Sequence, residues 1–366
     1  MAIILSVIKP FVRLGLKILS IALFVITLIS AYGGQINPEY LTVPAVLTLA
    51  LPYFAIATAI VAVAWFCFGR WFTAALGVLT LVASWSSVTT ASPLHFSKSP
   101  SDDSRTFTLL SYNMIHGWDQ EMDGSRQSPR TFNYIKDSGA DIIAAQEVTD
   151  IEEFNEEPAL RQVWDDLIKI YPYYAGTWRS DMKVFSKYPV KMVKEHQEYC
   201  LFEISTPWGR LNLLNIHLVS FHLAGDEKHV MRELVSGKDT KEGVKEMKTA
   251  LLPKLKTGFI NRAKSAKEVR ELIDNIKGPL IVCGDMNDVP ESYTYRMVRG
   301  TDLSDAYVET SFGPLITFNR YGFWFHLDQV LYRPDPLKAL KVTKGKIRSS
   351  DHYPIFAEFE GEASER

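Results

Sequence analysis

The first quarter of the chain is almost free of charged residues. Residues 18–38, 40–69 and 71–97 contain no Asp, Glu, Lys or Arg, and Glu39 and Arg70 separate these runs. A membrane-spanning helix needs roughly 20 apolar residues, and each run reaches that length. The pattern therefore predicts three transmembrane helices within residues 1–97, as in an integral, multi-pass membrane protein.

The positive charges around these runs predict an orientation. Lys9, Arg13 and Lys17 precede the first run, residues 33–39 contain no Lys or Arg, and Arg70 lies between the second and third runs. Lys and Arg favour the cytoplasmic side of a membrane. Three crossings would then place the rest of the chain in the periplasm or outside the cell.

Two other interpretations of the apolar runs are less favoured. A cleaved signal peptide followed by a buried helical core explains one run but not three in succession. A channel or sensor made by the helices themselves would be expected to carry charged groups within the membrane, and these runs have none. We therefore interpret residues 1–97 as a membrane anchor.

The pattern of the chain changes after this anchor. Residues 98–105 are rich in Ser and Asp and predict a linker. From residue 106 to residue 362, apolar segments of strand length, such as 141–147, alternate with amphipathic segments of helix length, such as 262–276. This alternation is typical of a layered α/β domain.

Polar side chains recur at the ends of the predicted strands. In the segment 279–288, a strand over 280–283 runs into Gly284 and is followed by Asp285 and Asn287. Ligands of α/β proteins bind at the carboxyl ends of strands. Each polar residue alone could be a turn former or a cap, but the set is large: Asn113, Glu147, Asn215, His217, Asp285, Asn287, Asp328, Asp351 and His352.

These residue types favour a hard, oxygen-preferring cation such as Mg²⁺ or Mn²⁺ over zinc, with Glu147 as the first candidate ligand. Hydrolysis of a phosphate ester also needs a base for the attacking water and donors for the charged oxygens. Asp285 could act as the base, and His217 and His352 could donate to the phosphate. Asp328 could hold one histidine charged and oriented.

The charge distribution leaves the partner open. A net charge of -2 gives no overall argument for nucleic acid. Residues 221–259 are long, polar and rich in lysine. This segment is interpreted either as a solvated helical excursion or as a basic lid that meets a phosphate backbone or an anionic membrane surface.

The ordered motifs resemble those of the endonuclease/exonuclease/phosphatase superfamily, which includes deoxyribonuclease, exonuclease III-like nucleases, inositol polyphosphate 5-phosphatases and neutral sphingomyelinases. The matching motifs are Ser111–Asn113, Gln146–Glu147, Phe185–Pro189, Asn215–Leu218, Gly284–Asn287, Leu327–Asp328 and Ser350–His352. The resemblance implies a four-layer α/β sandwich in which two packed β-sheets are flanked by helices. It also implies metal-dependent cleavage of a phosphoester by in-line attack of water, in a catalytic domain over residues 106–362.

The resemblance implies a role for each matching residue at the metal and the water. Glu147 would be the principal ligand of Mg²⁺ or Mn²⁺, Asn113 would lie at the same ion, and Asp351 would complete the metal site. Asp285 would orient or deprotonate the attacking water. Asn287 would position that water or the phosphate.

The same resemblance assigns the histidines. His217 would contact the phosphate, and His352, paired with Asp328, would stabilise the charged transition state. One departure lies next to this pair, because members of the superfamily often have a basic residue where this chain has His326.

Three functions remain open at this stage. The first is a membrane-anchored hydrolase whose substrate is a lipid headgroup or a small phosphodiester, favoured slightly because the anchor keeps the site near the bilayer. The second is a membrane-tethered nuclease that acts on DNA or RNA. The third is a catalytically inactive binding module, which is less favoured because the catalytic residue types are present. No protein partner is inferred.

Overall fold

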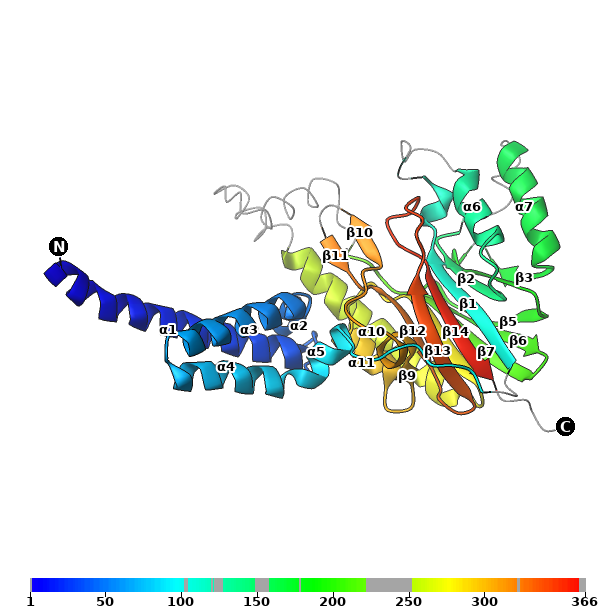
Figure 1. Cartoon of the computed structure of the whole chain (residues 1–366). Coiled ribbons are helices and arrows are strands. Elements are labelled where there is room, and N and C mark those ends of the chain that lie inside the picture. Colours follow the sequence, from blue (N-terminus) through cyan, green and yellow to red (C-terminus); the bar gives the residue numbers. More distant parts are fainter. Residues whose placement is uncertain are drawn as a thin grey trace.

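The computed structural model describes residues 2–101, 105–119, 121, 128–148, 158–177, 179–221, 252–320 and 323–361. A helical N-terminal region leads into an α/β domain (Figure 1). Of the basic segment 221–259, Phe221 and residues 252–259 are described, and the latter begin α10. The interpretation of the segment as a basic lid rests on residues that lie outside the described ones.

The N-terminal region contains more and shorter helices than the apolar runs predict. Its elements are α1 (Ala2–Tyr32), η1 (Gly33–Gln35), α2 (Val43–Thr48), α3 (Leu51–Cys67), α4 (Trp71–Ala83) and α5 (Trp85–Ala91). Helices α1, α3 and α4 pack side by side and extend away from the α/β domain, whereas α2 and α5 lie at the junction (Figure 1).

The prediction of three membrane spans is corrected by this structure. One described helix, Pro10–Gln35, is long and apolar enough to cross a membrane, and α4 with α5 would count as a second if this pair, bent by 61°, crossed as one unit. The second apolar run is divided because a proline starts each of α2 and α3, which leaves α3 with 17 residues. One apolar N-terminal helix fits a signal peptide or a single anchor, so the multi-pass prediction loses its support.

The α/β domain contains two mixed six-stranded sheets, which confirms the predicted α/β class. The first sheet has the order β13 (Leu337–Lys344), β14 (Ile355–Gly361), β1 (Arg105–Asn113), β2 (Ile142–Gln146), β4 (Lys183–Ser186) and β3 (Tyr173–Gly176). The second has the order β5 (Val190–Glu195), β6 (Tyr199–Thr206), β7 (Gly209–His217), β8 (Leu280–Asp285), β12 (Asp328–Tyr332) and β9 (Ser304–Asp305). β1 pairs with β2 in parallel, as β7 does with β8, and the other described pairs are antiparallel.

Three buried clusters define the layers of this domain. The first joins side chains of both sheets, among them Phe107 and Phe202, and therefore lies between them. The second packs helices α6 (Pro129–Lys136) and α7 (Pro158–Ile170) on the outer face of the first sheet. The third packs α10 (Leu252–Asn275) and α11 (Tyr293–Arg299) on the second sheet. Burial of these apolar faces is the main stabilising term, at about 25 cal/mol per Å².

Smaller elements complete the fold, and η2 and the β10–β11 pair contribute residues to the edge where the polar residues gather. They are η2 (Ile115–Gly117), α12 (Ala306–Thr310) and the two-stranded β10 (Phe318–Arg320) and β11 (Phe323–Phe325). Strand β8 continues through Gly284 instead of turning there. Gly284 has a φ of 128°, and a Cβ at this position would overlap the carbonyl oxygen of Ile216 on the neighbouring strand, so glycine is required.

The N-terminal region packs directly on the α/β domain. Gly34 lies so close to Glu291 that a Cβ at Gly34 would overlap the Glu291 carbonyl oxygen. The Ser87 hydroxyl donates to a carboxylate oxygen of buried Glu291 over 3.3 Å, and Lys267 of α10 pairs with Glu39 at 3.4 Å. The two regions therefore share a closely packed junction in addition to the covalent connection.

The segment predicted as a linker also contacts the α/β domain. The backbone N–H of Lys98 donates to the carbonyl of Leu340 over 2.7 Å, and the N–H of Ser101 donates to the carboxylate of Glu360 over 3.2 Å. The described part of this segment is therefore anchored along the domain surface.

Candidate active site

The strand order brings the polar ends of both sheets to one edge. Asn113 at the end of β1 is level with Gln146, the last residue of β2, and Glu147 follows it. On the second sheet, Asp285 at the end of β8 is level with His217 of β7 and with Asp328 of β12. Because β12 runs antiparallel to β8, its first residue meets the last residue of β8.

A buried amide pair joins the two sheets directly behind this edge. The side chain of Gln146 donates to Asn215 Oδ1 over 2.6 Å, and Asn215 Nδ2 donates to the carbonyl of Ala145 over 3.0 Å. Asn215, which the sequence analysis lists among the polar residues at strand ends, is fully buried. Its role is structural, because its hydrogen bonds fix the distance between the two sheets next to the site.

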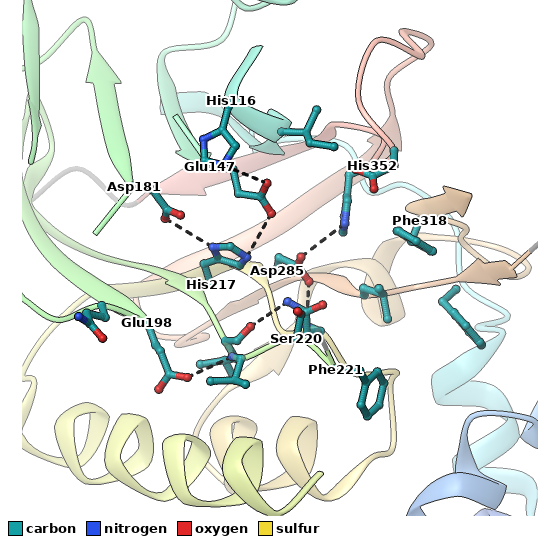
Figure 2. A pocket seen from close by; sticks show the side chains of 18 of the residues that line it. His116, Glu147, Asp181, Glu198, His217, Ser220, Phe221, Asp285, Phe318 and His352 are labelled. Carbon is teal, nitrogen blue, oxygen red and sulfur yellow. Dashed lines mark hydrogen bonds and ion pairs between the residues drawn. The ribbon is translucent and has the colours of Figure 1, made fainter. Parts of the chain in front are cut away.

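Glu147 faces the other charged groups from the first sheet. Asn113 Nδ2 donates to Glu147 Oε1 over 2.9 Å and to Asp285 Oδ2 over 3.2 Å, so one amide bridges the two carboxylates. Glu147 adopts a positive φ of 50°, which is uncommon outside glycine and which projects its side chain into the cavity (Figure 2).

His217 lies between two carboxylates at the open side of the site (Figure 2). Its Nε2 is 3.4 Å from Glu147 Oε1, and its Nδ1 is 3.5 Å from Asp181 Oδ1. Burial alone lowers the pKa of His217, but the hydrogen bond to Asp181 and the charges of Asp285 and Glu147 outweigh it and raise the pKa to about 9. The imidazolium is therefore favoured at neutral pH.

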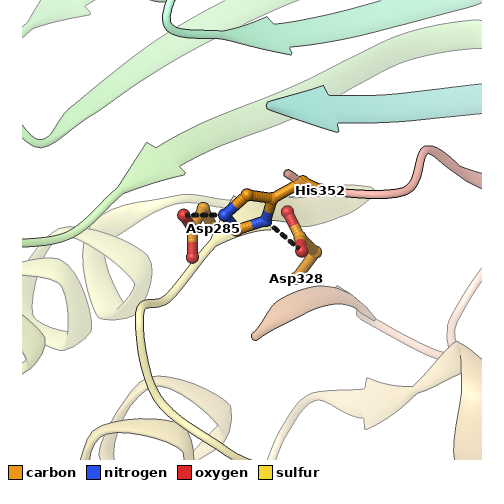
Figure 3. Close-up of side chains that lie close together, drawn as sticks. All are labelled: Asp285, Asp328 and His352. Carbon is orange, nitrogen blue, oxygen red and sulfur yellow. Dashed lines mark hydrogen bonds and ion pairs between the residues drawn. The ribbon is translucent and has the colours of Figure 1, made fainter. Parts of the chain in front are cut away.

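Asp285, Asp328 and His352 form a compact buried group (Figure 3). His352 Nδ1 bonds to Asp328 Oδ2 over 2.8 Å, and His352 Nε2 is 3.5 Å from Asp285 Oδ2. Burial lowers the pKa of His352, but the charges of Asp328 and Asp285 raise it well above its ordinary value. A charged imidazole between two carboxylates is the result.

The remaining two predicted residues also reach this edge. Asn287 has a positive φ of 50°; its backbone N–H donates to Asp285 Oδ1 over 2.7 Å and its side chain to the carbonyl of Leu218 over 2.8 Å. Asp351 lines the same cavity beside His352. All eight predicted site residues thus come together, six of them lining the cavity while Asn113 and Asp328 lie behind it.

The structure adds two titratable residues to the site that the sequence analysis missed. His116 and Asp181 line the cavity, and both have positive φ, at 58° and 49°. His116 follows Asn113 by three residues. Asp181 precedes β4, and because β4 runs antiparallel to β2, the start of β4 lies beside Glu147. Strained backbone concentrated at one edge is a mark of functional sites.

The side chains of the site differ in how well they suit a cation. Asp285, Asp328 and His352 each offer one ligand atom, and these atoms all lie within 4.8 Å of one another. A histidine must be neutral to bind a metal, whereas the two carboxylates hold His352 charged. Glu147, Asp285 and Asp351 on the cavity wall supply the carboxylate oxygens that Mg²⁺ or Mn²⁺ prefers. Asn113 would have to turn its amide to join them, since its nitrogen now faces the carboxylates.

Several solved structures are similar to this chain over about 70% of its length. Beta toxin from Staphylococcus aureus, in a mutant with bound magnesium ions, is 15% identical, with 69% of this chain and 99% of that chain covered and a TM-score of 0.43. Sphingomyelinase C from Streptomyces griseocarneus is 14% identical, with 69% and 99% covered and a TM-score of 0.41. An endonuclease/exonuclease/phosphatase from Beutenbergia cavernae is 14% identical, with 71% of this chain and 72% of that chain covered and a TM-score of 0.47.

Comparisons of the sequence divide the chain as the structure does. No curated protein matches it. Residues 13–91, in the helical region, match a family described as a domain of unknown function. Residues 121–352 match the model of the endonuclease/exonuclease/phosphatase family, and the chain belongs to that family.

Proposed function

We propose that the protein is a metal-dependent phosphoester hydrolase, with a catalytic domain over residues 106–362 joined through residues 98–105 to a helical region over 1–97. The observation that carries the proposal is the meeting of Glu147, Asp285, His217 and His352 around one cavity of about 680 Å³. Family membership supports phosphoester chemistry, and the carboxylates and charged histidines supply the parts which that chemistry needs.

Glu147 would hold the cation, with Asn113 and Asp351 completing its site. A bound Mg²⁺ or Mn²⁺ would polarise the phosphoryl group and neutralise its charge. Without a cation, the Asn113 amide donates to both the Glu147 and the Asp285 carboxylate, so the two carboxylates lie on either side of one amide group. Two negative groups held close together favour a divalent cation, because their mutual repulsion is relieved on binding.

Asp285 would orient the attacking water and accept its proton. Its Oδ1 is held by the N–H of Asn287 and its Oδ2 faces His352, so the carboxylate is fixed from both sides. The water oxygen then bonds to phosphorus as the ester P–O bond breaks. Asn287 would help to place the water or the phosphate.

The two charged histidines would stabilise the phosphate as its charge develops. Asp328 orients His352 through a 2.8 Å hydrogen bond, and Asp181 contacts the far nitrogen of His217. The second nitrogen of each ring faces a carboxylate that lines the cavity, Glu147 for His217 and Asp285 for His352. With substrate bound, that N–H would donate instead to an equatorial oxygen or return a proton to the departing ester oxygen.

The helix Pro10–Gln35 supports a single membrane anchor. Its hydropathy and length suit a bilayer, and Arg13 and Lys17 near its start favour a cytoplasmic N-terminus. One crossing would place the catalytic domain outside the cytoplasm, whereas a second crossing by α4 and α5 would place it in the cytoplasm. An alkaline phosphatase fusion after Arg366 distinguishes the two, because that reporter is active only outside the cytoplasm.

The chemistry is tested on the purified full-length protein in detergent. Plasmid DNA, RNA, phospholipids, inositol phosphates and bis-p-nitrophenyl phosphate are offered with Mg²⁺ or Mn²⁺ and again with chelator. Turnover that chelator abolishes and Glu147→Gln removes is the expected result. Turnover that resists both would remove the metal from the proposal, and binding without turnover would favour an inactive module.

A further inference from the structure

The cavity of the candidate active site has two walls of different chemistry. One wall carries the charged residues described above. The other is apolar and includes Leu49, Leu218, Phe221, Phe318, Phe325 and Leu327. A cavity of about 680 Å³ is large enough for a drug-sized ligand. Its ligand therefore combines a phosphate group with a substantial apolar part.

One residue of the apolar wall comes from outside the catalytic domain. Leu49 lies between α2 and α3 of the N-terminal region. It packs, with Ala45 of α2, on Leu255 and Phe259 of α10 and on Phe221. In Figure 2, Phe221 lies between Asp285 and the blue ribbon of the N-terminal region. The catalytic domain alone thus has an incomplete pocket.

The apolar wall is fixed in place by a buried arginine. The guanidinium carbon of Arg262 is 4.0 Å from the centre of the Phe221 ring and 5.0 Å from that of Phe259. Arg262 Nη1 donates to the carbonyl of Val219 over 3.0 Å, and its Nε is 3.5 Å from the Asp288 carboxylate. A fully buried cation held by two rings, a carbonyl and a carboxylate keeps residues 219–221 in one position. The wall is therefore formed before a ligand arrives.

We propose that the N-terminal helical region completes the substrate pocket, and that the substrate is a phospholipid whose apolar part lies against Leu49 and Phe221. This rests on the proposed hydrolase function and specifies its substrate class. A phospholipid is inferred because the apolar wall of the pocket continues into the exposed apolar surface of α3. Leu49 leads into α3, which exposes Tyr53, Ile56 and Ile60, and α3 packs on the helix that can cross a membrane. A lipid on that surface lies beside the wall.

The test uses the full-length protein in detergent micelles. Dioctanoyl phosphatidylcholine, phosphatidylethanolamine and phosphatidylglycerol are compared with their deacylated glycerophosphodiesters, which keep the headgroup and lose the apolar part. Bis-p-nitrophenyl phosphate reports phosphoester hydrolysis independently of any headgroup. We expect the acylated form of at least one headgroup to be preferred over its deacylated form.

Leu49→Ala should reduce this preference by about tenfold, mainly through KM, because an apolar contact with the ground state is lost. Leu49→Met should restore the preference, since it returns apolar volume. Leu47→Ala is the matched control: Leu47 is a partly exposed leucine two residues earlier that does not line the cavity, so the preference should be unchanged.

The outcomes separate this inference from the proposed function. If no substrate, including bis-p-nitrophenyl phosphate, shows chelator-sensitive turnover, both fail. If bis-p-nitrophenyl phosphate is hydrolysed but acylated and deacylated substrates are equivalent, the substrate class is overturned and the hydrolase stands. The same holds if plasmid DNA is cleaved in preference to lipid. An unchanged preference in Leu49→Ala overturns the part assigned to the helical region.

Discussion

The two sides of the candidate active site hold their charged groups differently. On the open side, Glu147 and His217 are 23% and 18% exposed and their nearest charged atoms are 3.4 Å apart. On the closed side, Asp328 and His352 are 1% and 6% exposed and are joined by a 2.8 Å contact. A hydrated carboxylate can exchange its ligands, whereas a buried hydrogen-bonded pair keeps one geometry. The open side therefore suits a cation and water, and the closed side suits a permanent charge.

Removing the carboxylate of the open side should have the largest effect on rate. Glu147→Gln keeps the shape of the side chain and its hydrogen bond to Asn113, but it weakens cation binding. We expect kcat/KM to fall by roughly 10³-fold, since several kcal/mol of transition-state stabilisation depend on the ion. Steady-state kinetics at saturating Mg²⁺ measure the loss, and an unchanged melting temperature excludes unfolding. Full activity would show that the open side does not hold the ion.

The closed side should behave as one unit. Asp328→Asn and His352→Gln should each lower kcat by roughly 10²- to 10⁴-fold, because the charged imidazole is lost or misoriented in both. The double variant should be little worse than the more damaged single variant. A double-mutant cycle on kcat measures this, and additive effects would mean that the 2.8 Å contact has no part in the reaction.

A smaller effect is expected at Asp181, which contacts His217 from the rim of the open side. Asp181→Asn should reduce kcat/KM by about tenfold, comparable to the loss of a partner that orients a functional histidine. Asp165→Asn, an exposed aspartate paired with Arg161 on α7, serves as control and should have no effect. Equal rates for both variants would leave Asp181 without a part in the site.

The last effect concerns the free energy of unfolding, not the rate, and involves His326 behind the closed side. Burial lowers the pKa of His326 to about 3, so this ring is neutral in the folded protein while it is protonated below about pH 6.5 in the unfolded chain. The unfolded state then binds more protons, and stability falls as pH decreases from 6.5 towards 3, by up to roughly 1.4 kcal/mol per pH unit. Urea unfolding of His326→Leu between pH 7 and pH 5 should show a shallower dependence. An identical slope would contradict the burial argument.

The sequence could predict the α/β class and the residues that meet at the site because both follow from local patterns. Asn113, Glu147 and Asp285 each end a short apolar strand, and a strand of apolar residues has few alternatives. Asp181 was missed because it precedes a strand that pairs antiparallel to β2, and the sequence of a strand does not reveal the direction in which it pairs.

The failures in the N-terminal region have a different cause. Absence of charge predicts an apolar environment but not the length of a helix, which Pro44, Pro52 and the bend near Ser84 determine. Leu49 could not be assigned to the pocket because its neighbours Phe221 and Leu255 are about 200 residues away in the chain, and their contact exists only after both regions have folded.

The contact of Gly34 with Glu291 sets how closely the helical region and the catalytic domain approach each other. Gly34 of η1, two residues after the end of α1 at Tyr32, meets the backbone of Glu291 with no side chain between them. Any side chain at position 34 would therefore push η1 away from Glu291 and disturb the seating of the helical region beside the pocket.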